Sequence, residues 1–265
     1  MDEYTIQLID NARSLYKDIV VGANSRITRG QRLWDLFEQA VKVCSVDAKS
    51  GDRQLGERIN ELAVAKSLAE DKGLQGTITY EPELLPDGRK IDFVADRGHD
   101  NAYIEVKTVH PDIADTEVAW ENYLKRRKLH PPNADFVTKK DWMGGRIYGN
   151  TFASRSRFLD YTLDFETRLA EAKKIRSGPA LLVFCGNGVR WRRSDLEDFA
   201  DFYHSGKHRQ DDPFRLMEDH HIESEKLEIL RNVDNFGCIT RRWEEAAINA
   251  FIWPVRGPSF GGVIR

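Results

Sequence analysis

Two carboxylates and a lysine in the middle of the chain have the residue types and the spacing of a metal-dependent hydrolytic site. Asp92 interrupts an apolar run between Ile91 and Phe93, and Glu105 and Lys107 interrupt a second such run. Alternate side chains of a strand point to the same face, so Glu105 and Lys107 share one face. Carboxylate oxygens hold Mg²⁺ together with water and phosphate. A nearby ammonium can orient water, help deprotonate it and offset negative charge in a transition state.

The stretch 90–109 is expected to form a β-hairpin that brings these three groups together. Asp92 must share a face with Glu105 and Lys107, which requires an even-numbered loop or a β-bulge. A four-residue loop over 98–101 would place Asp92 opposite Lys107 and diagonal to Glu105. The alternative explanation for Glu105 and Lys107 is a surface pattern on a half-exposed sheet.

The flanking sequence predicts the elements that would position this hairpin. Apolar residues at helical spacing predict helices over about 2–20, 31–46, 55–71 and 159–176. Runs rich in β-branched and aromatic residues predict further strands over 77–81 and 179–186. From the hairpin onward the order is therefore strand, strand, helix, strand, and a third strand of the core is not assigned. The remainder, from about residue 190, is expected to be mainly helical.

Asp92 followed by Glu105-Val106-Lys107 resembles the signature of the PD-(D/E)xK nuclease superfamily. This superfamily includes type II restriction endonucleases, archaeal Holliday-junction resolvases and many phage-defence and repair nucleases. The resemblance covers about 54–187, roughly half of the chain. It implies an α/β fold with a restriction-endonuclease-like core, in which an αβββαβ unit forms a mixed central sheet flanked by helices. Helical N- and C-terminal segments would be additions to that core.

The resemblance also implies the cofactor and the roles of the site residues. Mg²⁺ would be the metal, with Mn²⁺ able to substitute, and Asp92 and Glu105 would be its ligands. Lys107 would position the attacking water. An acidic residue on the helix before the sheet would hold water or a second metal, and Glu61 is the candidate because it adjoins the inward-packing face of the helix. Glu57 is the reserve candidate, and a solvated helix glutamate is the alternative for either.

Asp87 is a competing choice for the first metal ligand, because it follows Pro86 and so forms a literal Pro-Asp pair. Pro-Asp-Gly is also a turn sequence, in which proline fixes φ and glycine tolerates a positive φ. Asp87 therefore has a structural explanation that Asp92 lacks. We expect Asp92 to be the ligand.

Length and composition limit the class of protein. The 265 residues suffice for one large or two small domains. We expect an N-terminal helical segment over 1–50, a nuclease-like core over 51–190 with a basic insertion at about 110–158, and a C-terminal extension over 191–265. Three distant cysteines without a CxxC pair give no disulfide framework and no thiolate zinc site. No apolar run approaches a membrane span and the first residues are unlike a signal peptide, so we expect a cytoplasmic protein without a membrane partner.

Charge is unevenly distributed along a chain whose net charge is −3. Residues 120–158 carry nine Lys or Arg against three Asp or Glu, whereas residues 194–228 carry four against eleven. A basic surface beside a metal site could hold a phosphate backbone; a solvated loop and helix end is the alternative. The nucleic-acid-binding residues expected from this stretch are Lys125, Arg126, Arg127, Lys139, Lys140, Arg146, Arg155 and Arg157.

Together these observations predict a metal-dependent nuclease that hydrolyses DNA phosphodiester bonds, an endonuclease of restriction, defence or repair type. The alternative is a non-catalytic module on the same fold that binds nucleic acid or a protein, and the complete Asp/ExK set argues against it. A hydrolase of small phosphates is disfavoured because the chain has no GxxxxGK[ST] loop. Expected partners are DNA, a second copy of the chain if both strands are cut, and a protein not identified by the sequence.

Overall fold

A computed structural model describes residues 3–46, 48–71, 73–74, 76–109, 149–186, 193–205, 232–241 and 248–254. Within these ranges the chain is α/β, with five helices and one mixed sheet. The helices are α1 (Glu3–Val21), α2 (Gly30–Val46), α3 (Ala48–Glu70), α6 (Gly149–Ile175) and α7 (Arg193–Ser205). The strands are β1 (Ile27–Thr28), β2 (Ile78–Tyr80), β3 (Phe93–Asp96), β4 (Asn101–Val109), β5 (Ala180–Gly186), β6 (Asn235–Arg241) and β7 (Ile248–Pro254).

The seven strands lie side by side in chain order. β3 runs antiparallel to both of its neighbours, β2 and β4, whereas β4, β5 and β6 are parallel to one another. The short strand β1 is parallel to β2 at one edge, and β7 is antiparallel to β6 at the other. Among the described residues the order from α3 to β5 is helix, three strands, helix, strand, and its last four elements, β3, β4, α6 and β5, agree with the order strand, strand, helix, strand predicted from the sequence.

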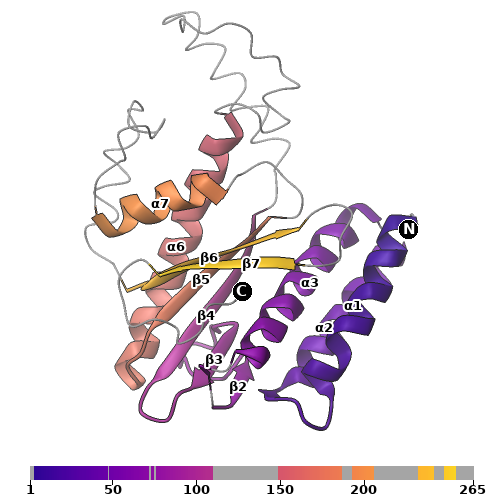
Figure 1. Cartoon of the computed structure of the whole chain (residues 1–265), viewed down its shortest axis with the longest axis horizontal. Coiled ribbons are helices and arrows are strands. Elements are labelled where there is room, and N and C mark those ends of the chain that lie inside the picture. Colours follow the sequence, from indigo (N-terminus) through magenta and orange to yellow (C-terminus); the bar gives the residue numbers. More distant parts are fainter. Residues whose placement is uncertain are drawn as a thin grey trace, which may run out of the picture.

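The sheet is the middle of three layers. Figure 1 shows α1, α2 and α3 on one side of the sheet and α6 and α7 on the other. The side chains of β4 alternate between the two layers: Ile104 and Val106 join the cluster under α1–α3, while Tyr103 and Val109 join the cluster under α6 and α7. By the same alternation Glu105 and Lys107 belong to the α6 face.

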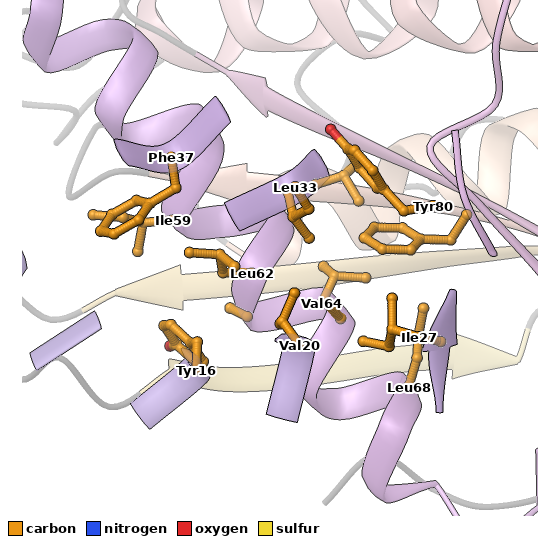
Figure 2. Packing of buried hydrophobic residues seen from close by; sticks show 14 of the residues in the cluster. Tyr16, Val20, Ile27, Leu33, Phe37, Ile59, Leu62, Val64, Leu68 and Tyr80 are labelled. Atoms are coloured by element: carbon orange, nitrogen blue, oxygen red, sulfur yellow. The ribbon is translucent and has the colours of Figure 1, made fainter. Parts of the chain in front are cut away.

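The layer formed by α1–α3 is closed by a continuous apolar cluster. Figure 2 shows side chains of all three helices meeting over the sheet, among them Val20 of α1, Phe37 of α2 and Leu62 of α3. Leu33, Phe37 and Leu62 have no exposed surface. Each fully buried side chain of this size contributes about 1.5–3 kcal/mol relative to an exposed one, so α1 and α2 are integral to the layer that supports α3.

The helices agree with the sequence except at their starts. α3 begins at Ala48 and α6 at Gly149, several residues before the positions at which their apolar periodicity becomes clear. The α3 extension (48–54) is mostly polar, whereas the α6 extension (149–158) ends in Phe158, which is fully buried. Within the described parts of the chain, none of the helices combines the length and apolarity that a bilayer crossing needs.

The C-terminal extension was expected to be mainly helical, and for its described part this is wrong. After α7 the chain returns as β6, which is parallel to β5, and then as β7. β6 is buried: Phe236 and Cys238 have no exposed surface. The sheet therefore continues past residue 190: in its described part the extension adds β6 and β7 to the sheet and covers one face of it with α7.

The β3–β4 hairpin has the even loop that the site requires, but its register differs from the expected one. Asp96 pairs with Asn101, so the loop is 97–100 and not 98–101. Asp96 accepts a hydrogen bond from the Gly98 amide at 2.8 Å, and Gly98 adopts a φ of 87°, which closes the loop one residue early. Continuing this register places Asp92 opposite Glu105 and not opposite Lys107.

Candidate active site

Asp92 lies immediately before β3, at the end of the sheet where β2 and β4 finish. Its Oδ2 accepts a hydrogen bond from the Val106 amide at 2.8 Å, and its own amide donates to Glu105 Oε2 at 3.3 Å. The pKa of Asp92 is raised well above its usual value, first by burial and then by the negative charges of Glu105 and Glu61. The structure thus brings Asp92 and Glu105 together, as the sequence predicted.

Glu105 is the most buried acid of the site, with 1% of its surface exposed. Its Oε1 accepts from two cations, Lys107 Nζ and Arg168 Nη2, each at 2.7 Å. A buried carboxylate is stable only when it is paired, and here both cations contact the same oxygen. Among the described residues the other oxygen, Oε2, accepts only the long bond from the Asp92 amide.

Lys107 points to the same face as Glu105, as expected from the strand alternation. Its Nζ also lies 3.8 Å from Asp164 Oδ2 and 5.9 Å from the centre of the Tyr161 ring. Burial alone would lower the pKa of Lys107, but the negative charges of Glu105 and Asp92 outweigh it, and the pKa is raised. Lys107 is therefore held as an ammonium, which suits a role in orienting water or offsetting charge better than a role as a base.

Arg168 on α6 is a site residue that the sequence analysis missed. Only 7% of its side chain is exposed, and it donates to Glu105, to Asp164 Oδ2 at 2.7 Å and to the Lys90 carbonyl. One guanidinium thereby joins α6 to β4 and to the chain just before Asp92. The sequence did contain a signal for a buried cation. Arg168 lies at helical spacing from Phe165 and Ala172, which are both buried, so it shares the inward face of the helix.

Glu61 approaches the site from the opposite layer, on α3. Arg58 Nη1 donates to Glu61 Oε1 at 2.8 Å and to Oε2 at 2.6 Å, and the Tyr80 hydroxyl donates to Oε2 at 2.8 Å. Figure 2 shows the Tyr80 ring beside the apolar cluster with its hydroxyl directed away from the labelled aliphatic side chains. Glu61 is thus close enough to influence Asp92, but both of its oxygens are engaged by Arg58 and Tyr80.

The Asp92–Glu105 pair has the donor set for one hard cation. Asp92 Oδ1 has no hydrogen bond with the described residues, and Glu105 Oε2 has only the 3.3 Å contact. Mg²⁺ commonly binds through one or two carboxylates and completes its shell with water and phosphate. Among the described residues no group of three or more His, Cys, Asp or Glu side chains is arranged to hold a metal.

The other predicted residues are placed as follows. Asp87 lies in an exposed turn and accepts from the Arg89 amide at 3.0 Å, as its turn sequence indicated. Arg155 and Arg157 belong to the first turns of α6, but their side chains lie outside the described part. The remaining residues of the predicted basic surface lie wholly outside the described residues: Lys125, Arg126, Arg127, Lys139, Lys140 and Arg146.

Comparison of the chain with protein-family models, with curated proteins and with solved structures gave no match.

Proposed function

We propose that this chain is a Mg²⁺-dependent deoxyribonuclease, an endonuclease of restriction, defence or repair type. The observation that carries the proposal is the adjacency of Asp92 and Glu105 at the end of the sheet, with Lys107 bonded to Glu105 at 2.7 Å. The order of elements around these residues, with β3 antiparallel to β2 and β4 and with helices on both faces, supports a restriction-endonuclease-like core.

In this proposal each residue has a defined task. Asp92 and Glu105 bind Mg²⁺, which supplies an acidified water and a positive charge for the phosphoryl oxygens. Lys107 orients the water and stabilises negative charge that develops on the phosphate. Arg168 fixes Glu105 so that Oε2 faces Asp92, because it contacts Oε1. The basic stretch 120–158 supplies contacts to the DNA backbone.

One observation favours a second candidate, a non-catalytic module on the same fold that binds nucleic acid or a protein. Glu105 and Glu61 are both engaged by cations of this chain, Glu105 by Lys107 and Arg168, and Glu61 by Arg58. A carboxylate already neutralised by arginine attracts a metal less strongly. The nuclease is favoured because, with the described residues, Asp92 Oδ1 has no hydrogen bond and Glu105 Oε2 has only a 3.3 Å contact. A purely structural ion-pair cluster does not require two neighbouring carboxylate oxygens without a close partner.

The test is cleavage of supercoiled plasmid and of short single- and double-stranded DNA, with Mg²⁺, with Mn²⁺ and with EDTA. Asp92→Asn and Lys107→Ala proteins are run beside the wild type. Asp87→Asn and Lys174→Ala are matched controls, since Asp87 lies in an exposed turn and Lys174 pairs with Glu171 on the surface of α6.

We expect metal-dependent cleavage that both site variants lose by at least about 100-fold and that both controls retain. Cleavage that survives Asp92→Asn and Lys107→Ala would refute the assignment of the site. DNA binding without cleavage under every metal condition would favour the non-catalytic module.

A further inference from the structure

Arg58 of α3 lies at the border between the apolar layer and the site, with 26% of its side chain exposed. Every hydrogen bond that it makes with the described residues uses the same nitrogen. Nη1 donates to the two Glu61 oxygens and lies 3.1 Å from the Tyr80 hydroxyl oxygen. Glu61 and Tyr80 are themselves buried, so they hold one corner of the guanidinium from the interior.

The rest of the guanidinium is left for a ligand. A guanidinium has five N–H donors, and Nε with the near N–H of Nη2 forms the edge that matches the two oxygens of a phosphate. That edge has no bond with the described part of the chain. A side chain whose only purpose was to neutralise Glu61 would gain more from placing both Nη groups on the carboxylate.

Arg58 is also close enough to Asp92 for their charges to interact. Burial alone would lower the pKa of Arg58, but the negative charge of Glu61 and the hydrogen bonds to it outweigh burial and raise the pKa, with a smaller contribution from Asp92, so the side chain is a permanent cation within electrostatic reach of Asp92. Glu61 in turn has no oxygen without a partner, because Oε1 and Oε2 both accept from Arg58 and Oε2 also accepts from Tyr80.

We infer that Arg58 binds the backbone phosphate of the nucleic acid held at the Asp92–Glu105 pair, and that Glu61 and Tyr80 orient Arg58 rather than bind metal. The inference rests on the proposed nuclease function and deepens it. It assigns the α3 glutamate to phosphate recognition, in place of the second-metal role expected for Glu61 from the sequence.

The experiment measures DNA binding apart from cleavage. Binding of a short labelled duplex is followed by fluorescence anisotropy in EDTA over a range of salt concentrations, and Mn²⁺ binding to the protein alone is measured by calorimetry. The variants are Arg58→Ala, Arg58→Lys and Glu61→Gln. Arg13→Ala is the matched control. It removes the same positive charge, but from an arginine of α1 that pairs with Glu38 of α2.

For Arg58→Ala we expect about tenfold weaker DNA binding, a salt slope reduced by about one, and at least about 100-fold slower cleavage. Arg58→Lys keeps the positive charge but lacks the paired N–H donors of the guanidinium, so it should recover only part of the DNA affinity. Because it retains a cation beside Glu61, it replaces Arg58→Ala as the test variant if the alanine protein does not fold. Glu61→Gln removes the charge that orients Arg58; it should weaken DNA binding by up to the about tenfold expected for Arg58→Ala and leave Mn²⁺ affinity unchanged.

Two results would overturn the inference while leaving the nuclease intact: cleavage and binding by Arg58→Ala and Arg58→Lys equal to those of Arg13→Ala, or a Glu61→Gln protein with wild-type DNA affinity and weakened Mn²⁺ binding. A wild-type protein that neither binds nor cuts DNA would overturn the nuclease proposal and this inference together.

Discussion

Replacing Arg168 with methionine tests whether the site is held together by the ion pairs on Glu105. Methionine fills a similar volume but removes the guanidinium, which contacts Glu105 and Asp164 at 2.7 Å each and the Lys90 carbonyl. The variant leaves Glu105, which is 1% exposed, with Lys107 as its one remaining cation among the residues that the structure describes. We expect the protein to fold and to be markedly less stable.

The expected loss follows from the burial of each partner. The charged hydrogen bond to buried Glu105 contributes about 1.5–3 kcal/mol. The bond to the Lys90 carbonyl adds about 1 kcal/mol, and the pair with Asp164, which is 56% exposed, adds about 0.5 kcal/mol. The sum is about 3–4.5 kcal/mol, within the range for breaking a buried ion pair. For a chain of this size that lowers Tm by about 6–18 °C.

The assay is urea and thermal unfolding of the wild type, Arg168→Met, Glu105→Gln and the double variant. A neutral glutamine at position 105 no longer needs a second cation. The double variant should therefore lose about 2 kcal/mol less free energy of unfolding than the two single variants lose in total. Arg13→Met, at an exposed surface pair, should cost at most about 0.5 kcal/mol. A loss below about 1 kcal/mol for Arg168→Met, or strictly additive single losses, would refute the account.

Two further predictions concern stability away from Glu105. Arg26 donates to three carbonyl oxygens at and after the end of α3, at 3.0–3.2 Å, so Arg26→Ala should lower the free energy of unfolding by about 1.5–3 kcal/mol in urea titrations; a loss no larger than that of Arg13→Ala would contradict this. Burial raises the pKa of Glu166, which accepts from the Tyr203 hydroxyl and from two backbone amides. A raised folded-state pKa means that stability is fully present below the unfolded pKa, about 4.3, and is lost as pH rises through the folded pKa. The stability of Glu166→Gln relative to wild type should therefore increase from pH 4 to pH 8 in thermal melts, and a relative stability that is flat or falls over this range would exclude the effect.

The elements of the core could be predicted from the sequence because their signals are local. Helical apolar spacing located α3 and α6, and alternation located β3 and β4 with the right faces for Asp92, Glu105 and Lys107. The register was missed because loops 97–100 and 98–101 both satisfy the face requirement. The choice between them depends on the side chain of Asp96, which binds the Gly98 amide.

The parts that could not be predicted depend on partners distant in the sequence. β6 forms because β5 offers it a parallel neighbour and because Phe236 packs against Phe184 across the two strands. The sequence of residues 235–241 alone does not indicate which strand it pairs with. The contact between Arg168 and Glu105 spans 63 residues, and it requires that α6 cross the same face of β4 as the carboxylate.

The central claim is that Asp92 and Glu105 together bind one divalent cation. The most direct measurement is the titration of purified protein with Mn²⁺, followed by electron paramagnetic resonance and by calorimetry, for the wild type, Asp92→Asn, Glu105→Gln and Asp87→Asn. The account predicts one bound Mn²⁺ for the wild type and for Asp87→Asn, and at least about tenfold weaker binding for each of the other two. Equal binding by all four proteins, or none by the wild type even with DNA present, would contradict it.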